Sequence, residues 1–279
     1  MKRRTLIPLL AAALLGVVNA DDKSNPDTLR VALLPDENAS TIIKANEGFQ
    51  AYLEEKTGKK VELVVTTDYA SMIEAMRRGR IELGYFGPLS YTLAKDKSPE
   101  IEAFAAQKKK GSATYHSIII GNVESGVKKP EDVEGKTMAY GDQASTSSHL
   151  IPKSILLNMG LKAGDQYEEQ FLGAHDAVAL AVQNGNAEMG GMSEPIYHDM
   201  VERGILDPEK VKILMTSEPF PNYPWTMQGY LAPELKEALK KAFFELDDME
   251  ILKEMKADGF APITDKDYDK VRALKPVLE

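Results

Sequence analysis

The stretch from Thr137 to Asn158, TMAYGDQASTSSHLIPKSILLN, constrains the fold of this chain most tightly. A short apolar strand is expected to end at Gly141. Four hydroxyl residues follow in a row, before an apolar run that is typical of a helix. Proline is tolerated only in the first turn of a helix, so Pro152 places the expected helix cap near Ser147 or Ser148. This one stretch therefore predicts a strand, a tight turn and a helix start.

The start of this helix is a candidate anion site. Its free backbone N–H groups and the hydroxyls of Ser145, Thr146 and Ser147 can donate to a negatively charged group, which the helix dipole also favours. No lysine or arginine occurs between Lys136 and Lys153, so neutral hydrogen bonds would hold the ligand. A simple capping motif is the alternative interpretation, because serine and threonine are common helix caps.

The N-terminus has the pattern of a secretory signal peptide. Lys2, Arg3 and Arg4 precede an apolar segment that is too short to span a membrane as a helix, and we expect cleavage near Ala20. The chain has no cysteine, which excludes disulfides and thiol catalysis and predicts that no lipid anchor is attached. These features predict a protein that is free in the periplasm of a double-membraned bacterium.

The net charge of the chain limits the kinds of molecule that it can bind. The sequence has 34 lysines and arginines and 43 aspartates and glutamates. Removing the three basic residues of the expected signal peptide leaves 31 basic residues and a net charge of about −12. Such an acidic protein is unsuited to nucleic acid or to an anionic membrane surface.

Apolar strands alternate with helices along the rest of the chain, which predicts an α/β fold with mainly parallel sheets flanked by helices. Leu29–Pro35 is typical of a buried parallel strand, and the segment from Ser40 to about Lys56 is expected to form one helix. A second unit begins near Asn122 and is inserted into the first. We predict one lobe of residues 21–118 with 216–279 and a second of residues 119–215, joined by hinge strands near 118–122 and 211–217.

Ligands of open α/β sheets bind beyond the carboxyl ends of the strands. Helix starts from both lobes would face one cleft there, and hinge motion would close it. The segments expected at this edge are Asp36–Ser40, Thr66–Tyr69, Tyr85–Ser90, Ser145–Ser148, Gly173–Asp176 and Ser193-Glu194, with Asn222, Tyr223 and Trp225 from a Pro-rich loop.

Several of these residues have a purely structural alternative. Tyr85 and Phe86 point to opposite faces of a strand, so one of them is expected in the core. Tyr69 could be a surface aromatic residue, and His175 could cap its own helix. His198 follows Glu194 by four residues, which favours an exposed helical pair over a metal site.

Four segments in combination resemble the phosphonate-type periplasmic binding proteins of ABC transporters: TDYASMIEAMRRGRIELGYFGPLSY, AYGDQASTSSHLIPK, GAHDAVALAV and SEPIY. VALLPDENAS and the YPW loop are most similar to the phosphite-binding members of that family. The resemblance covers nearly the whole mature chain. It implies a two-lobed periplasmic-binding-protein fold of type II, which closes on a small phosphorus oxyanion and delivers it to an ABC permease in the inner membrane.

The resemblance also implies roles for single residues. The hydroxyls of Ser145, Thr146 and Ser147 would clamp the ligand oxygens. Tyr69 and His175 would donate hydrogen bonds from opposite lobes and stabilise the closed form.

Two departures from the family pattern bear on the ligand. Glu194 matches one of two acidic residues that hold the amine of aminoalkyl phosphonates in relatives, whereas the second acid is replaced by Asn222-Tyr223. Glu194 could instead accept from a protonated ligand oxygen or orient His175. Phe86 stands where the family has a tyrosine. Loss of one acid weakens the case for a ligand with an amine.

Phosphite has three oxygens and one P–H bond, and its hydrogen neither donates nor accepts well. A pocket with aromatic carbon at that position would accept phosphite, whereas phosphate would bury an unpaired oxygen at a cost of about 1–3 kcal/mol. The aromatic candidates are Tyr69, Phe86, Tyr223 and Trp225.

We expect a solute-binding protein that acts as a monomer, without catalysis, cofactor or metal. Alternatives remain open at this point: a phosphonate such as methylphosphonate or 2-aminoethylphosphonate as the ligand, or a sensor that presents its closed lobes to a membrane kinase. An exported hydrolase is disfavoured, because the chain has no G-x-S-x-G elbow, no metal-ligand set and no positive clamp.

Overall fold

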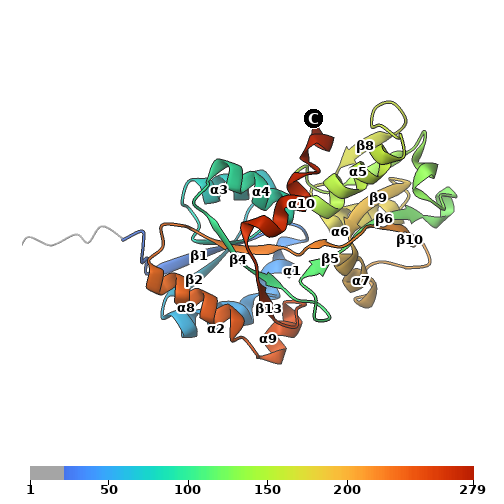
Figure 1. Cartoon of the computed structure of the whole chain (residues 1–279). Helices are drawn as coiled ribbons and strands as arrows, with labels where there is room; N and C mark the ends of the chain where they lie inside the picture. Colours follow the sequence, from blue (N-terminus) through green and yellow to red (C-terminus); the bar gives the residue numbers. More distant parts are fainter. Residues whose placement is uncertain (1–21) are drawn as a thin grey trace, which may run out of the picture.

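The computed structural model describes residues 22–279, and the expected signal peptide lies outside this range. Two large β-sheets with flanking helices lie side by side (Figure 1). We call the six-stranded sheet with its helices lobe 1 and the five-stranded sheet with its helices lobe 2. Within residues 22–279, no helix has both the length and the apolar character needed to cross a membrane.

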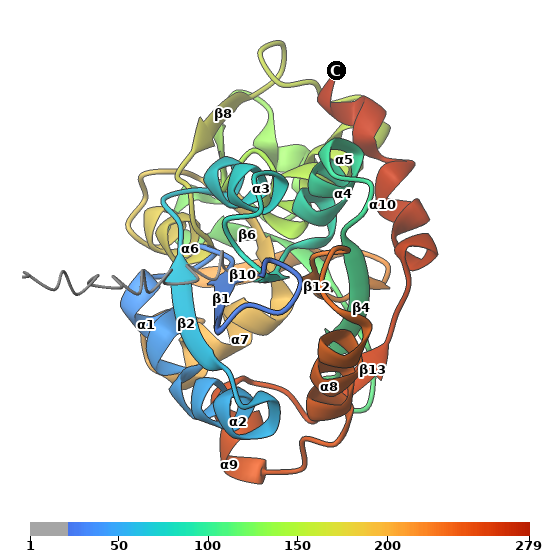
Figure 2. The same cartoon turned by 90° about the vertical axis from the view of Figure 1, so that its left-hand side faces the viewer.

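Lobe 1 has the strand order β13-β4-β12-β3-β1-β2. Its strands are β1 (Thr28–Leu33), β2 (Lys60–Val65), β3 (Leu83–Tyr85), β4 (Glu102–Gln107), β12 (Pro224–Met227) and β13 (Phe260–Pro262). Its helices are α1 (Ala39–Lys44), α2 (Glu47–Thr57), α3 (Tyr69–Arg77), α4 (Pro88–Lys97), α8 (Pro233–Phe244), α9 (Met249–Glu254) and α10 (Asp269–Arg272). Figure 2 shows α3 and α4 on one side of this sheet and α2 and α8 on the other.

Lobe 2 has the strand order β10-β6-β9-β7-β8. Its strands are β6 (Ser117–Asn122), β7 (Thr137–Tyr140), β8 (Glu168–Phe171), β9 (Met189–Ser193) and β10 (Val211–Thr216). Its helices are α5 (Ile151–Asn158), α6 (His175–Gln183) and α7 (Glu194–Glu202). A separate two-stranded ladder of β5 (Thr114–Tyr115) and β11 (Phe220–Pro221) lies between the lobes (Figure 1).

The alternating pattern predicts mainly parallel sheets, whereas both observed sheets are mixed. In lobe 1, β1 pairs in parallel with β2 and β3, but β12 is antiparallel to β3 and β4. In lobe 2, β7 pairs in parallel with β8 and β9, but β6 is antiparallel to β9 and β10. Strands β6 and β12 follow a crossing between the lobes. A segment that crosses from the other lobe enters the sheet at the edge that faces that lobe. The parallel strands end at this edge, so the entering strand runs antiparallel to them.

The crossings lie outside the strands expected to form them. The segments near 118–122 and 211–217 are strands β6 and β10, which pair with each other in the sheet of lobe 2, from Val211 with Asn122 to Thr216 with Ile118. The chain passes between the lobes in the residues just before β6 and just after β10, where β5 and β11 pair. Two antiparallel segments therefore connect the lobes.

The predicted helix from Ser40 to Lys56 is divided into α1 and α2. Asn46 is the residue at the break, where its side-chain Nδ2 donates to the carbonyl of Ile42 at 2.8 Å. An asparagine side chain competes with the backbone for such carbonyls, and this competition ends helices. Asn46 is also the N-cap residue of α2.

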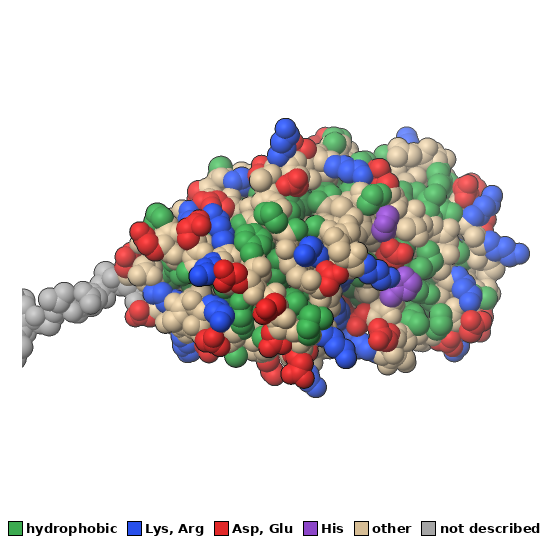
Figure 3. All heavy atoms as spheres, turned by 60° about the horizontal axis from the view of Figure 1, so that its bottom comes forward, with side chains coloured by type: hydrophobic (Ala, Val, Ile, Leu, Met, Phe, Trp, Pro, Cys, Tyr) green, Lys and Arg blue, Asp and Glu red, His purple; other side chains and the backbone are tan. Residues whose placement is uncertain are grey.

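The surface carries mixed charge. Figure 3 shows acidic and basic side chains interspersed over one face of the molecule. The described part of this face carries no broad basic stripe of the kind that binds nucleic acid.

A substitution of Gly190 in β9 can test how closely α6 packs on the sheet of lobe 2. A Cβ atom at this position would lie 2.6 Å from Cγ1 of Val178 and 3.0 Å from Cγ2 of Val182. We expect Gly190→Ala to lower the free energy of unfolding by about 1–3 kcal/mol, because overpacking forces the neighbours to shift. Urea denaturation measures the change.

Gly48→Ala in α2 is the matched control. The added Cβ would meet the flexible Ile251 side chain at 3.3 Å, and alanine is favoured over glycine in a helix by about 0.5–1 kcal/mol. Equal stability of the Gly190→Ala variant and the wild type would contradict the described packing.

Candidate ligand-binding site

The hydroxyl run forms a π-helical turn, Thr146–Leu150, in front of α5. Its cap is Ser145 rather than the expected Ser147 or Ser148. The Ser145 hydroxyl accepts from the backbone N–H of Ser148 at 3.1 Å. The cap thus lies two or three residues further from Pro152 than an α-helical start predicts.

Pro152 and Ser117 explain this turn. In a π-turn, a backbone N–H donates to the carbonyl five residues earlier, as Ile151 does to Thr146. The next carbonyl is that of Ser147, and Pro152 has no N–H to donate to it. The hydroxyl of Ser117 in β6 donates to this carbonyl instead, at 2.7 Å. The helix start is therefore held by a residue of the neighbouring strand.

The four hydroxyls have different tasks. Ser148 is structural, because its hydroxyl donates to the carbonyl of Gly191 and accepts from the N–H of Gly141. Thr146 Oγ1 accepts from the N–H of Leu89 in lobe 1 at 2.7 Å. Ser147 Oγ is buried and has no hydrogen-bond partner within residues 22–279.

Three hydroxyls of the turn can still donate to a ligand. Ser145 and Thr146 each use their oxygen as an acceptor, which leaves the hydroxyl hydrogen available. Ser147 has its whole hydroxyl available. The hydroxyls predicted from the sequence to bind an anion are thus those with a hydrogen to spare.

His175, the first residue of α6, is a neutral donor. Its Nδ1 accepts from the backbone N–H of Ser193 at 3.1 Å, so the ring hydrogen is on Nε2. Nε2 is buried and has no partner in the described chain. Burial lowers the pKa of His175 to about 3, which keeps the ring uncharged at neutral pH. The backbone N–H of His175 also donates to the carbonyl of Asp36 across the lobes, at 2.8 Å.

Four tyrosines from separate segments come together beside these donors. Tyr85 and Tyr115 both contact Tyr223, with ring centroids 5.5 Å and 5.3 Å from it. The hydroxyl of Tyr115 is buried without a hydrogen-bond partner in the described residues and lies next to the hydroxyl of Ser147. Tyr69, at the start of α3, lies with its phenol next to the hydroxyl of Ser145.

Asp36 supplies the negative charge of this region. Burial raises the pKa of Tyr69, Tyr85 and Tyr223 well above the usual range, and the charge of Asp36 adds to each shift. Asp36 comes directly after Pro35 at the carboxyl end of β1, which is the buried strand predicted from the sequence. Burial, followed by repulsion from Glu37, raises the pKa of Asp36 itself to about 7.

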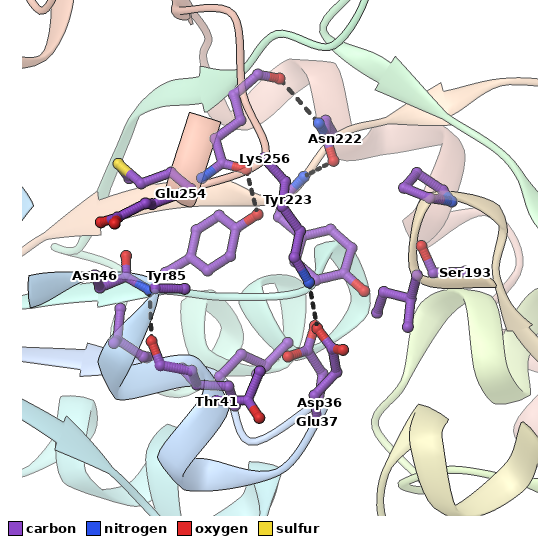
Figure 4. Close-up of a pocket in the computed structure, with 18 of the residues that line it drawn as sticks. Asp36, Glu37, Thr41, Asn46, Tyr85, Ser193, Asn222, Tyr223, Glu254 and Lys256 are labelled. Carbon is purple, nitrogen blue, oxygen red and sulfur yellow. Dashed lines mark hydrogen bonds and ion pairs between the residues drawn. The ribbon is translucent and has the colours of Figure 1, made fainter. Parts of the chain in front are cut away.

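A cavity of about 90 Å³ lies beside this group (Figure 4). Asp36, Tyr85 and Tyr223 line it from lobe 1 and Ser193 from lobe 2. Lys109 also lines it, and burial lowers the pKa of this lysine to about 8.

Residues 108–110 were expected to form a solvated turn, but Lys109 lines the cavity instead. Lys110 and Gly111 have φ angles of 51° and 75°, so the loop reverses there and Lys109 pairs with Ser112. This tight turn directs Lys109 toward the space between the lobes. No local pattern in the sequence distinguishes it from its two lysine neighbours.

Two predicted aromatic contacts lie in the core of lobe 1. Trp225 is fully buried, with its ring 5.5 Å from Phe49 and 5.0 Å from Tyr85 between centroids. Trp225 thus supports the ring of Tyr85 from behind and does not line the cavity. Phe86 is fully buried in the apolar cluster that contains Met72 and Tyr69, and it does not line the cavity.

Glu194 contacts a residue of its own helix. Its Oε1 is 3.7 Å from Nε2 of His198 on the same helix, and its side chain is 29% exposed. The predicted exposed helical pair is therefore present. Asn222 is engaged as well, since its side chain donates to the carbonyl of Gln107 and accepts from the N–H of Tyr223.

The burial of His175 predicts a pH effect on stability. The unfolded chain has a histidine pKa near 6.5, so it binds one more proton than the native state between about pH 6.5 and 3. The free energy of unfolding therefore falls as the pH is lowered through this window. We expect this histidine to account for up to about 2 kcal/mol of the loss between about pH 7 and 5.

Urea denaturation of wild type and His175→Gln at several pH values measures this contribution, because the variant lacks the titrating ring. His198→Gln is the matched control, since the ring of His198 is exposed. An equal pH slope for wild type and His175→Gln would contradict a buried neutral ring.

Comparisons with known proteins bear on this site. The sequence model of a family described as "ABC transporter, phosphonate, periplasmic substrate-binding protein" matches residues 31–268. The phosphate-import protein PhnD of Mycolicibacterium smegmatis is 30% identical over 272 residues, covering 88% of this chain and 84% of the relative. The probable ABC transporter phosphite binding protein PhnD1 of Prochlorococcus marinus is 22% identical, with coverage of 95% and 94%.

Solved structures show the same fold. PhnD1 of Prochlorococcus marinus in complex with methylphosphonate superposes with a TM-score of 0.85 at 20% identity, covering 91% of this chain and 99% of that chain. A binding protein component of an ABC phosphonate transporter from Pseudomonas aeruginosa gives a TM-score of 0.82 at 21% identity, with coverage of 90% and 86%. These superpositions confirm the predicted periplasmic-binding-protein fold.

Proposed function

We propose that phosphite is the ligand of this chain, which belongs to the family of periplasmic substrate-binding proteins of phosphonate ABC transporters. Proteins of this family bind a solute and work with an ABC transporter, and they are not enzymes. We further propose that a signal peptide is removed near Ala20, and that the mature protein acts as a monomer and passes its ligand to a permease in the inner membrane.

The observation that carries the proposal is a set of unpaired buried donors. The hydroxyls of Ser147 and Tyr115 and the Nε2–H of His175 have no partner in the described chain. Each such group costs about 1–3 kcal/mol when buried without a hydrogen bond, so the site is incomplete without an acceptor. The backbone N–H groups of Thr146 and Ser147 precede the first hydrogen bond of the π-turn and add to the set. The oxygens of a small oxyanion could accept hydrogen bonds from these groups.

The aromatic side of the site favours phosphite over phosphate. The rings of Tyr85, Tyr115 and Tyr223 form an aromatic wall. Trp225 packs against the ring of Tyr85 in this wall. A P–H bond can face aromatic carbon, whereas the fourth oxygen of phosphate would be left there without a full set of hydrogen bonds. Tyr223 is thus the predicted aromatic candidate that remains at the cavity, together with the neighbouring Tyr85.

Methylphosphonate is the second candidate, because the cavity beside Tyr85 and Tyr223 has room for a small substituent. The case for 2-aminoethylphosphonate is weaker. Glu194 lies next to His198, and Asn222 is occupied by the backbone, so neither position offers a free carboxylate for an amine.

Titration calorimetry with phosphite, phosphate, methylphosphonate and 2-aminoethylphosphonate tests the ligand. We expect phosphite to bind tightest and phosphate to bind about 10²-fold more weakly, because the wall cannot pair its fourth oxygen. Ser147→Ala is expected to weaken phosphite binding by about 1–3 kcal/mol. Ser154→Ala, two turns further along the same helix, is the matched control. Tighter binding of phosphate or of the aminated ligand would contradict the proposal.

Closure of the lobes on the ligand is supported by ion pairs at the rim of the cavity. Nζ of Lys256 lies 3.1 Å from Glu37 in lobe 1 and 2.9 Å from Asp199 in α7 of lobe 2. Arg203 contacts the same Asp199 carboxylate at 3.0 Å. Figure 4 shows the ion pair of Lys256 and Glu37 beside Asp36. We propose that this network stabilises the closed form.

Removal of the network should weaken ligand binding. We expect Lys256→Met to weaken phosphite binding by about 1 kcal/mol, or about fivefold, since partly exposed ion pairs contribute about that much. The variant should also lose part of the salt dependence of binding. Lys253→Met, an exposed lysine of α9, is the control. If Lys256→Met binds phosphite as the wild type does at low salt, the network has no role in closure.

A further inference from the structure

Asp36 is an acceptor in a site made of donors. No other residue between 22 and 279 donates a hydrogen bond to its carboxylate, although its backbone carbonyl accepts from His175. The carboxylate is half-buried and lines the inter-lobe cavity (Figure 4). When the lobes close on a ligand, a carboxylate in this position loses water, so a hydrogen-bond donor from the ligand would stabilise it.

Several titratable and charged groups surround Asp36. The titratable and charged groups that face it are Glu37, Lys109 and Lys256, the phenols of Tyr69, Tyr85, Tyr115 and Tyr223, and the neutral His175. Lys256 is already shared between Glu37 and Asp199. Tyr85 donates to Gln107 at 3.0 Å.

We propose that Asp36 accepts a hydrogen from a P–O–H group of the ligand, so that the site selects a phosphorus oxyanion that carries one proton. This inference rests on the proposed function, because it concerns the same ligand. It assigns Asp36 the acceptor role that the sequence allowed for Glu194, whose carboxylate lies next to His198 instead.

Charge accounting supports this role. The ring of His175 offers the ligand a donor but no acceptor, and the hydroxyls of Ser145 and Thr146 already accept from backbone N–H groups. The ionised carboxylate of Asp36, in contrast, can only accept. A fully deprotonated ligand would place two negative charges next to the carboxylate of Asp36. One proton between the two groups removes this repulsion and forms a charge-assisted hydrogen bond.

The proton is available near neutral pH. The pKa of Asp36 is raised to about 7 by burial and by Glu37, so the free carboxyl group already holds a proton part of the time. The complex then contains one proton, whichever oxygen carries it. Above the pKa values of both partners, binding must take up that proton from solution, and affinity falls about tenfold per pH unit.

Proton uptake by Lys109 must be distinguished from proton uptake at Asp36. Its pKa is lowered to about 8 by burial, so an arriving anion could also cause it to take up a proton. We therefore place the test in a Lys109→Met background, in which Asp36 is the remaining site group that titrates in this range.

Calorimetry with phosphite at about pH 8.5, in buffers of different ionisation enthalpy, counts the protons taken up on binding. We expect close to one proton for Lys109→Met and close to none after Asp36→Asn is added. The affinity of the double variant should no longer fall between about pH 7.5 and 9, because the amide of asparagine can donate to the ligand as well as accept from it. Glu194→Gln is the matched control and should retain the uptake.

Three outcomes overturn the inference. These are no proton uptake by the Lys109→Met protein, unchanged uptake after Asp36→Asn, or loss of uptake in Glu194→Gln. If Asp36→Asn fails to fold, Asp36→Ser carries the same expectation, since a hydroxyl also donates and accepts. Absence of phosphite binding by the wild type would contradict the proposed function instead, and methylphosphonate, which also has P–O–H groups, then serves as the probe for Asp36.

Discussion

The hydrogen bond from Ser117 Oγ to the carbonyl of Ser147 is the interaction on which the site depends. Pro152 removes the backbone donor for this carbonyl, and the side chain of a neighbouring strand replaces it. The helix start can therefore widen into a π-turn instead of fraying. That turn places Ser147 at the interface of the lobes, where its hydroxyl has no partner within residues 22–279. π-turns are rare and occur frequently at functional sites, which agrees with this arrangement.

Neutral groups make up most of the hydrogen-bond donors of the candidate site. His175 is kept uncharged by burial, and the tyrosines and hydroxyls carry no formal charge. Charged groups lie further out, in the network around Lys256, where they join the lobes. This separation has a physical advantage. Neutral donors lose less solvation free energy than charged ones when the lobes close and exclude water.

Some residues of the site could be predicted from the sequence, and others could not. Ser145–Ser147, Tyr69 and His175 lie at helix starts that follow strands, so the local pattern predicts their position, and the structure brings them together. Asp36 was expected at the same edge for the same reason. Tyr115 and Lys109 could not be found this way. Tyr115 reaches the site because β5 pairs with β11, and Lys109 because a turn with two positive φ angles reverses the loop.

The class of the fold, the order of its elements and the presence of a helix start at the hydroxyl run could all be predicted from the sequence, because they follow from apolar periodicity and turn residues over short distances. Long-range packing, in contrast, makes both sheets mixed and places Trp225 and Phe86 in the core. Strand direction after a crossing and the facing of a side chain depend on partners that are distant along the chain. Such partners leave no local pattern, so packing alone selects between the alternatives.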